Sequence, residues 1–74
     1  MPGPNRPTYT AHARRRMAER KVTEREVEIV LVHHHARRRD AKGNEVLLGR
    51  VRGRRIKVVV ARGSSPPHVI TVGD

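Results

Sequence analysis

Residues 22–32 have the sequence VTEREVEIVLV, which suits either a helix or a strand. The predicted fold depends on which of the two this stretch forms. Thr23 and Glu26 have the spacing of a capping box, in which each side chain satisfies a backbone N–H at the start of a helix. Val22 and Val27 flank the box at the positions of a hydrophobic staple. The many β-branched residues that follow favour a strand instead. The capping box tips the prediction towards a helix that begins after Thr23.

The chain before this stretch predicts a tail and one more helix. Residues 1–7 contain three of the five prolines, which predicts a disordered tail. Thr10 can cap a helix from Ala11 to Arg20, although the apolar stripe of that helix is poor. The folded part is therefore expected as a single domain over residues 8–74.

After His35 the apolar pattern changes to that of strands joined by short turns. The arginine-rich residues 36–41 give only a weak signal. The predicted strands are Glu45 to Arg52, Arg55 to Ala61 and His68 to Val72, with turns at residues 42–44, at Gly53 and at residues 63–67. The predicted fold class is α+β, with two N-terminal helices packed on a three- to four-stranded antiparallel sheet.

Composition restricts the classes of function. The chain has 74 residues, 35% of them hydrophobic, with Tyr9 as the only aromatic residue and no cysteine. Disulfide scaffolds and thiolate metal sites are therefore excluded. No stretch approaches the length of a membrane span and the N-terminus lacks a signal-peptide core, so we expect a cytoplasmic protein without membrane contact. The net charge of +10 predicts a polyanionic partner: RNA, DNA or an acidic protein.

The net positive charge is larger in the sheet-forming part, because residues 29–74 hold ten of the seventeen basic residues and only three of the seven acidic residues. The candidates for phosphate binding are Arg50, Arg52, Arg54, Arg55 and Lys57. Strand alternation would place Arg50 and Arg52 on one face, and Arg55 and Lys57 on one face after the turn. Together they could form a floor that binds the nucleic-acid backbone without sequence specificity. The alternative is a solvated outer face, although like charges so close repel one another when no anion is present.

A second candidate site lies on the first predicted helix. His12, Arg16 and Arg20 are four residues apart and so share one face of the helix. Phosphodiester cleavage needs such a set, because an imidazole moves protons near neutral pH while guanidinium groups hold the phosphate. A lone helical histidine is more often structural, and that alternative stays open. His68 could supply a second proton carrier.

The run His33-His34-His35 invites a metal interpretation. Consecutive side chains point in different directions on a helix or a strand, so three ligands for one ion are not expected. Histidines also suit the negative end of a helix dipole. We therefore predict no metal site and no cofactor.

Four segments resemble a known family: residues 9–13 (YTAHA), the pattern RM-x-ER-x-VT-x-x-EV over residues 16–27, residues 56–60 (IKVVV) and residues 69–72 (VITV). The resemblance is to a domain-of-unknown-function family of small bacterial proteins that is grouped with the RelE/ParE-type toxin superfamily and is similar to BrnT toxins. It implies a RelE-like fold and, by analogy with the superfamily, an RNA-cleaving toxin inhibited by an antitoxin. The positions that the family marks are His12, Arg16, Arg20 and Thr71.

The chain departs from that family at two places. Lys21 stands where the family commonly has glycine, at a helix-ending position that glycine fills at least cost. The aromatic residue expected after Thr71 is missing, although RNA-binding sites usually stack bases on aromatic rings.

The sequence thus predicts an RNA-directed basic protein whose catalytic form would be a metal-independent endoribonuclease toxin. His12 would move the proton, and Arg16, Arg20, Arg52 and Arg55 would hold the phosphate. The predicted partners are RNA, as mRNA or ribosome, and an acidic antitoxin. The alternative is a noncatalytic basic module that binds nucleic acid or an acidic protein.

Overall fold

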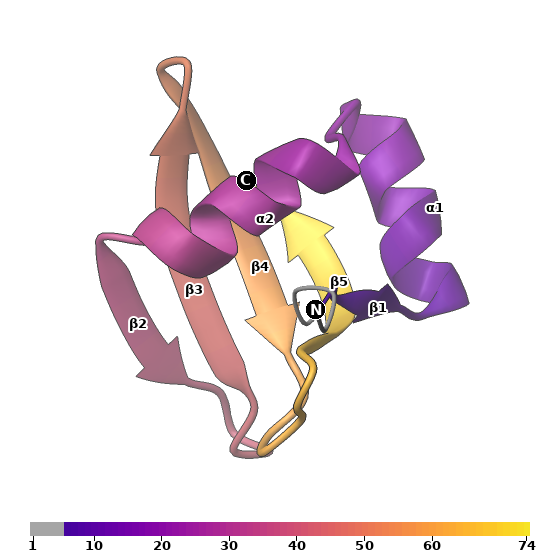
Figure 1. The fold of residues 1–74 in the computed structure, drawn as a ribbon, viewed down its shortest axis with the longest axis vertical. Helices are drawn as coiled ribbons and strands as arrows, with labels where there is room; N and C mark the ends of the chain where they lie inside the picture. The colour runs from indigo at the N-terminus through magenta and orange to yellow at the C-terminus, as the bar shows by residue number, and fades with distance from the viewer. Residues whose placement is uncertain (1–5) are drawn as a thin grey trace, which may run out of the picture.

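The computed structural model describes residues 6–74, so most of the predicted tail, residues 1–5, lies outside the described residues. Two helices, α1 (Ala11–Arg20) and α2 (Glu24–His33), lie on one side of a sheet (Figure 1). The strands are β1 (Thr8–Tyr9), β2 (Ala36–Arg39), β3 (Glu45–Val51), β4 (Arg54–Val60) and β5 (His68–Gly73). No helix within residues 6–74 is long and apolar enough to cross a membrane.

The α+β class is confirmed, but the sheet differs from the prediction. It has five strands in the order β1-β5-β4-β3-β2 and is mixed rather than antiparallel, because β1 runs parallel to β5. The remaining neighbours are antiparallel. The two additional strands are those at the edges.

Both edge strands form through backbone pairing that leaves little trace in the sequence. Residues 36–39 read ARRR, without the alternation of a half-buried strand, yet they pair in register with β3 from Ala36↔Leu48 to Arg39↔Glu45. The short β1 is held at both ends, since Thr8 N–H donates to the Pro67 carbonyl at 2.9 Å and Thr10 N–H donates to the Val69 carbonyl at 3.1 Å. These strands follow from their neighbours and not from their own side chains.

The ends of α1 are held by specific contacts. Thr10 Oγ1 accepts from Ala13 N–H at 2.9 Å and donates to the Ile70 carbonyl at 2.8 Å, which joins the start of the helix to β5. Lys21 ends the helix in the left-handed conformation with φ of 56°. This is the conformation for which glycine is the favoured residue.

The capping box of α2 is confirmed. Glu26 N–H donates to Thr23 Oγ1 at 3.1 Å, and Thr23 N–H donates to Glu26 Oε1 at 2.9 Å. Residues 27–32 are therefore helical, and the strand alternative is wrong. Two orphan donors of the first turn are satisfied, which outweighs the β-preference of the valines.

The main core is aliphatic and lies between the helices and the sheet, with α1 against β5 and α2 against β3 and β4. Its completely buried residues include Ala13 and Val27 from the helices and Val58, Val69 and Val72 from the strands. At Gly49, an added Cβ would lie 3.0 Å from Val30 Cγ2, so α2 approaches the sheet closely there.

We expect Thr23→Ala to lower the free energy of unfolding by about 1 kcal/mol, because it removes the N-cap acceptor of α2. Thr23→Ser, which keeps the hydroxyl, is the matched control and should retain most of that free energy. Urea unfolding followed by circular dichroism measures both. Equal stability of the alanine and serine variants would contradict the proposed contribution of the cap.

Candidate nucleic-acid interface

The side of the sheet that faces away from the helices carries most of the strand cations. On β3 and β4 the residues Leu47, Val51, Ile56, Val58 and Val60 belong to the helix-side core. Because side chains alternate along a strand, their neighbours project from the opposite side. We call this side the outer face, and it is formed by Ala36 and Arg38 of β2, Val46, Leu48 and Arg50 of β3, Arg55, Lys57 and Val59 of β4, and Thr71 of β5.

Strand register arranges the outer face in rows. One row runs Arg38–Val46–Val59–Thr71, and the next runs Ala36–Leu48–Lys57–Gly73. Neighbouring positions in a row are about 4.8 Å apart, and successive rows are about 7 Å apart. Val46 and Val59 are each only 7% exposed, so these two side chains are buried, and Leu48 is the half-buried aliphatic residue at the middle of the face.

Arg50 and Arg55 bring two like charges together on the outer face. They are directly opposite one another across β3 and β4, one pair before the turn at residues 52–53. Both are exposed, and within the described residues neither takes part in an ion pair. Like charges at directly opposed positions destabilise a sheet. The pair is therefore set up to gain from a bound anion.

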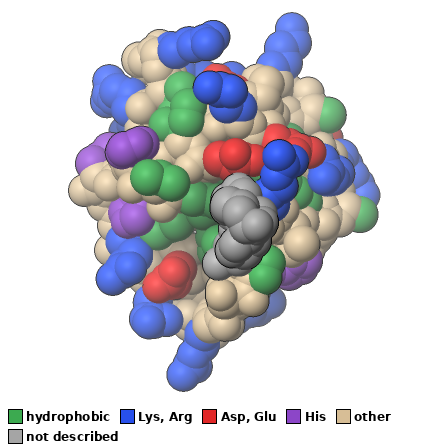
Figure 2. Space-filling view, in the orientation of Figure 1, with side chains coloured by type: hydrophobic (Ala, Val, Ile, Leu, Met, Phe, Trp, Pro, Cys, Tyr) green, Lys and Arg blue, Asp and Glu red, His purple; other side chains and the backbone are tan. Residues whose placement is uncertain are grey.

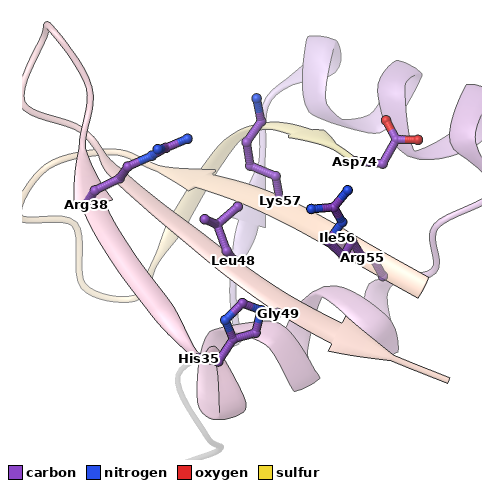
Figure 3. Close-up of a pocket in the computed structure, with 8 residues that line it drawn as sticks. All are labelled: His35, Arg38, Leu48, Gly49, Arg55, Ile56, Lys57 and Asp74. Atoms are coloured by element: carbon purple, nitrogen blue, oxygen red, sulfur yellow. The ribbon is translucent and has the colours of Figure 1, made fainter. Parts of the chain in front are cut away.

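A hollow of about 290 Å³ opens beside this pair on the outer face (Figure 3). It is lined by His35, Arg38, Leu48, Gly49, Arg55, Ile56, Lys57 and Asp74. In Figure 3 the side chains of Arg38 and Lys57 rise from different strands above Leu48, and Asp74 lies at the side of Arg55. Three cations and one carboxylate thus surround an apolar floor, an arrangement suited to a phosphate group attached to a less polar body.

The helix side has a different charge pattern. Figure 2 shows this side, where acidic side chains lie among the basic ones. Four of the seven acidic residues belong to α1 and α2: Glu19, Glu24, Glu26 and Glu28. Two of them form ion pairs, Arg14 with Glu24 at 2.6 Å and Arg16 with Glu19 at 3.5 Å. Positive charge is therefore less compensated on the outer face.

The predicted set of five phosphate-binding cations is divided by the structure. Arg50, Arg55 and Lys57 share the outer face, as predicted for the last two. Arg52 does not share it, because β3 ends at Val51 and Arg52 lies in the hairpin turn with φ of 55°. Gly53 follows with φ of 78°, so both turn residues have the positive φ of a two-residue type I′ hairpin.

Arg54 lies on the helix side of the sheet, since adjacent strand residues point to opposite faces. Its guanidinium donates to the Lys21 carbonyl at 3.0 Å and also to the Arg20 carbonyl. Arg54 therefore satisfies the last carbonyls of α1, where a cation is favoured by the helix dipole. It links the end of α1 to β4, and its guanidinium is engaged by these two carbonyls.

Of the site predicted on α1 (His12, Arg16 and Arg20), only Arg20 contacts a residue that lines the hollow. Arg20 Nη1 lies 2.7 Å from Asp74 Oδ1, so it contacts a residue of the hollow. His12, exposed in the first turn of α1, is eight residues away, about 12 Å along the helix axis. Neither it, Arg16 nor Thr71 is among the described residues that line the hollow, although Thr71 lies on the outer face.

The histidines have separate positions. His34 ends α2, with Nδ1 at 3.2 Å from the Val30 carbonyl, and His68 Nδ1 lies 2.7 Å from Thr8 Oγ1 between β5 and β1. Within residues 6–74 no group of three or more histidine or acidic side chains could hold a metal ion. Among the histidines, His35 alone lines the hollow. The sequence drew attention to it only within the run His33-His34-His35, as a metal ligand, and not as a residue of a phosphate site.

The only aromatic ring is not part of the outer face. Tyr9 packs against the helix-side core, and the Arg14 guanidinium lies 4.6 Å from its ring centroid. Burial, together with the charges of Glu24 and Glu28, raises the pKa of Tyr9 to about 12. Base stacking on an aromatic ring is therefore not available beside the hollow.

The family model described as Domain of unknown function (DUF4258) matches residues 9–74. The chain belongs to this family. No curated protein matches the chain significantly, and no solved structure does either. The DUF4258 description names no activity, so the likeness to RelE/ParE-type and BrnT toxins, and the acidic antitoxin it implies, stay predictions.

We expect Arg54→Met to lower the free energy of unfolding by about 1–2 kcal/mol, because the carbonyls at the end of α1 lose a charged donor. The neighbouring substitution Arg55→Met is the matched control. It should change the stability by less than about 0.5 kcal/mol or increase it, since it relieves repulsion with Arg50. Thermal or urea unfolding of both variants checks this. A larger loss for Arg55→Met would contradict the assignment of the two faces.

Proposed function

We propose that this DUF4258 domain binds RNA through the outer face of its sheet. The observation that carries the proposal is the opposed pair Arg50–Arg55 beside a hollow lined by Arg38 and Lys57. Within the described residues, these four cations have no ion-pair partner. An anion with several linked phosphates would relieve their mutual repulsion at more than one point.

The form of the face favours a flexible single strand. Cations lie around the half-buried Leu48, so a chain could place its phosphates on the rim and its sugars or bases over Leu48. Because no aromatic ring is available to stack a base, backbone contacts would dominate the affinity. Binding should therefore depend strongly on salt and weakly on base sequence.

The double variant Arg50→Gln/Arg55→Gln tests this interface. For a single-stranded uridine oligonucleotide, the slope of log affinity against log salt concentration should become shallower by about 1–2, since each phosphate contact contributes about 0.7. The control Arg15→Gln/Arg25→Gln removes the same charge from exposed helix positions and should change the slope much less. Fluorescence anisotropy over a range of salt concentrations gives both values.

Equal losses for the two double variants would mean that diffuse charge, and not the outer face, binds RNA. If the wild-type chain bound an acidic protein but no oligonucleotide, the alternative of a noncatalytic module for an acidic partner would replace the proposal.

A second candidate function is RNA cleavage, and the position of His35 in the hollow favours it. A neutral imidazole could take the proton of a 2′-hydroxyl, whose oxygen would attack the adjacent phosphorus. The bond from phosphorus to the 5′ oxygen would break, leaving a 2′,3′-cyclic phosphate, and the departing 5′ oxygen would take up a proton from water to become a 5′-hydroxyl. Arg38 and Lys57 would stabilise the charge that develops on the phosphorane. In this proposal His35 takes the role of proton carrier that the helical spacing of His12, Arg16 and Arg20 predicted for His12.

We expect His35→Gln to lower the rate of RNA cleavage at least about 100-fold while oligonucleotide affinity stays within about twofold. His12→Gln is the matched control and should keep the rate. A substrate with 2′-deoxyribose at the cleavage position must remain intact. A loss of activity in His12→Gln alone would return the proton transfer to α1, and a wild-type chain without turnover would leave RNA binding as the function.

A further inference from the structure

Asp74 is the one acidic residue among the described residues that line the hollow. Its carboxylate forms an ion pair with Arg20, with Oδ1 at 2.7 Å from Nη1. The two side chains are 37% and 55% exposed for Arg20 and Asp74, so solvent and other ions can reach the contact. A phosphate oxygen can replace the Asp74 carboxylate on the Arg20 guanidinium, because a phosphate and a carboxylate both accept hydrogen bonds from the same donors.

The sheet register explains why the carboxylate lies at this position. Gly73 is the partner of Lys57, so Asp74 continues β5 at the level of Ile56. The neighbours of Ile56 along β4 are Arg55 and Lys57, the two β4 cations of the outer face. By alternation Asp74 belongs to the helix side at this level, where its carboxylate contacts Arg20 of α1, and at the end of β5 it also lines the hollow that Arg55 and Lys57 line.

The backbone on the helix side of this contact is held independently of Asp74. Arg54 donates to the carbonyls of Arg20 and Lys21, which joins the end of α1 to β4. If the Arg20–Asp74 pair opens, only side chains need to move. The Arg20 guanidinium then becomes a further cation at the edge of the hollow.

We propose that the Asp74 carboxylate occupies a phosphate position and that RNA binds by displacing it from Arg20. This inference rests on the proposed RNA-binding function and deepens it. In the free protein Asp74 neutralises Arg20 and lowers the positive potential of the hollow. A bound phosphate replaces the Asp74 carboxylate on Arg20. The carboxylate therefore competes with every anion for Arg20, and it weakens most the binding of anions that make only one contact. A strand with several phosphates overcomes it through its other contacts.

The variant Asp74→Asn tests the proposal, and Glu24→Gln is its matched control. Each substitution raises the net charge by one and releases one arginine, Arg20 or Arg14, from an exposed ion pair of similar length. Only Asp74 lines the hollow. For the uridine oligonucleotide at low salt we expect Asp74→Asn to raise the affinity roughly three- to tenfold and to steepen the salt slope by about 0.7, equal to one further phosphate contact. Glu24→Gln should raise the affinity by less than about twofold, because its arginine is distant from the hollow.

A third variant shows whether Arg20 receives the phosphate. Adding Arg20→Gln to Asp74→Asn should remove the gain in affinity, whereas adding Arg14→Gln should leave it. Circular dichroism checks that every variant is folded.

Equal effects of Asp74→Asn and Glu24→Gln, or a gain that survives Arg20→Gln, would overturn the proposal while wild-type RNA binding stands. A wild-type chain that does not bind the oligonucleotide would overturn the proposed function and this inference together.

Discussion

The register of the β3–β4 hairpin is the constraint on which the rest of the structure depends. Its two-residue turn places Val51 opposite Arg54 and Arg50 opposite Arg55. A slip of one residue would turn every side chain of a strand to the other face, exposing Ile56 and Val58 and burying arginines. The burial of the aliphatic side chains therefore fixes where the charges lie, although the charges themselves oppose one another.

The two sides of the sheet have divided roles as a result. Both helices cover the same side of the sheet. There α2 is held by the close contact of Val30 with Gly49, and α1 by the hydrogen bond from Thr10 to the Ile70 carbonyl. Arg54 belongs to that structural side, one residue from Arg55 on the outer face. A cation that completes a helix end and a cation available to a ligand are thus adjacent in sequence and opposite in space.

The outer face carries repulsion that the helix-side core must offset. The chain has 74 residues and one aromatic, so its aliphatic core is small. Uncompensated charge on one face therefore lowers the stability of the folded state by a considerable share. An anion bound there would remove the repulsion and stabilise the folded state by mass action. This links the electrostatics of the outer face to the RNA-binding proposal, in which Asp74 is the one carboxylate among the described residues that line the hollow.

The sequence by itself determined the elements whose signals are local. Thr10 and the Thr23–Glu26 box marked the helix starts, and the alternation at Ile56, Val58 and Val60 marked the buried face of β4, because capping and periodicity involve residues a few positions apart. Only the tertiary structure decided the edge strands, the separation of Arg54 from Arg55 and the turn position of Arg52, since these depend on where β3 ends and on pairing with distant strands. The placement of His35 and Asp74 at one hollow, with Arg20 paired to Asp74, also required the complete sheet. Segments far apart in the chain meet there through backbone register, which no local pattern of side chains records.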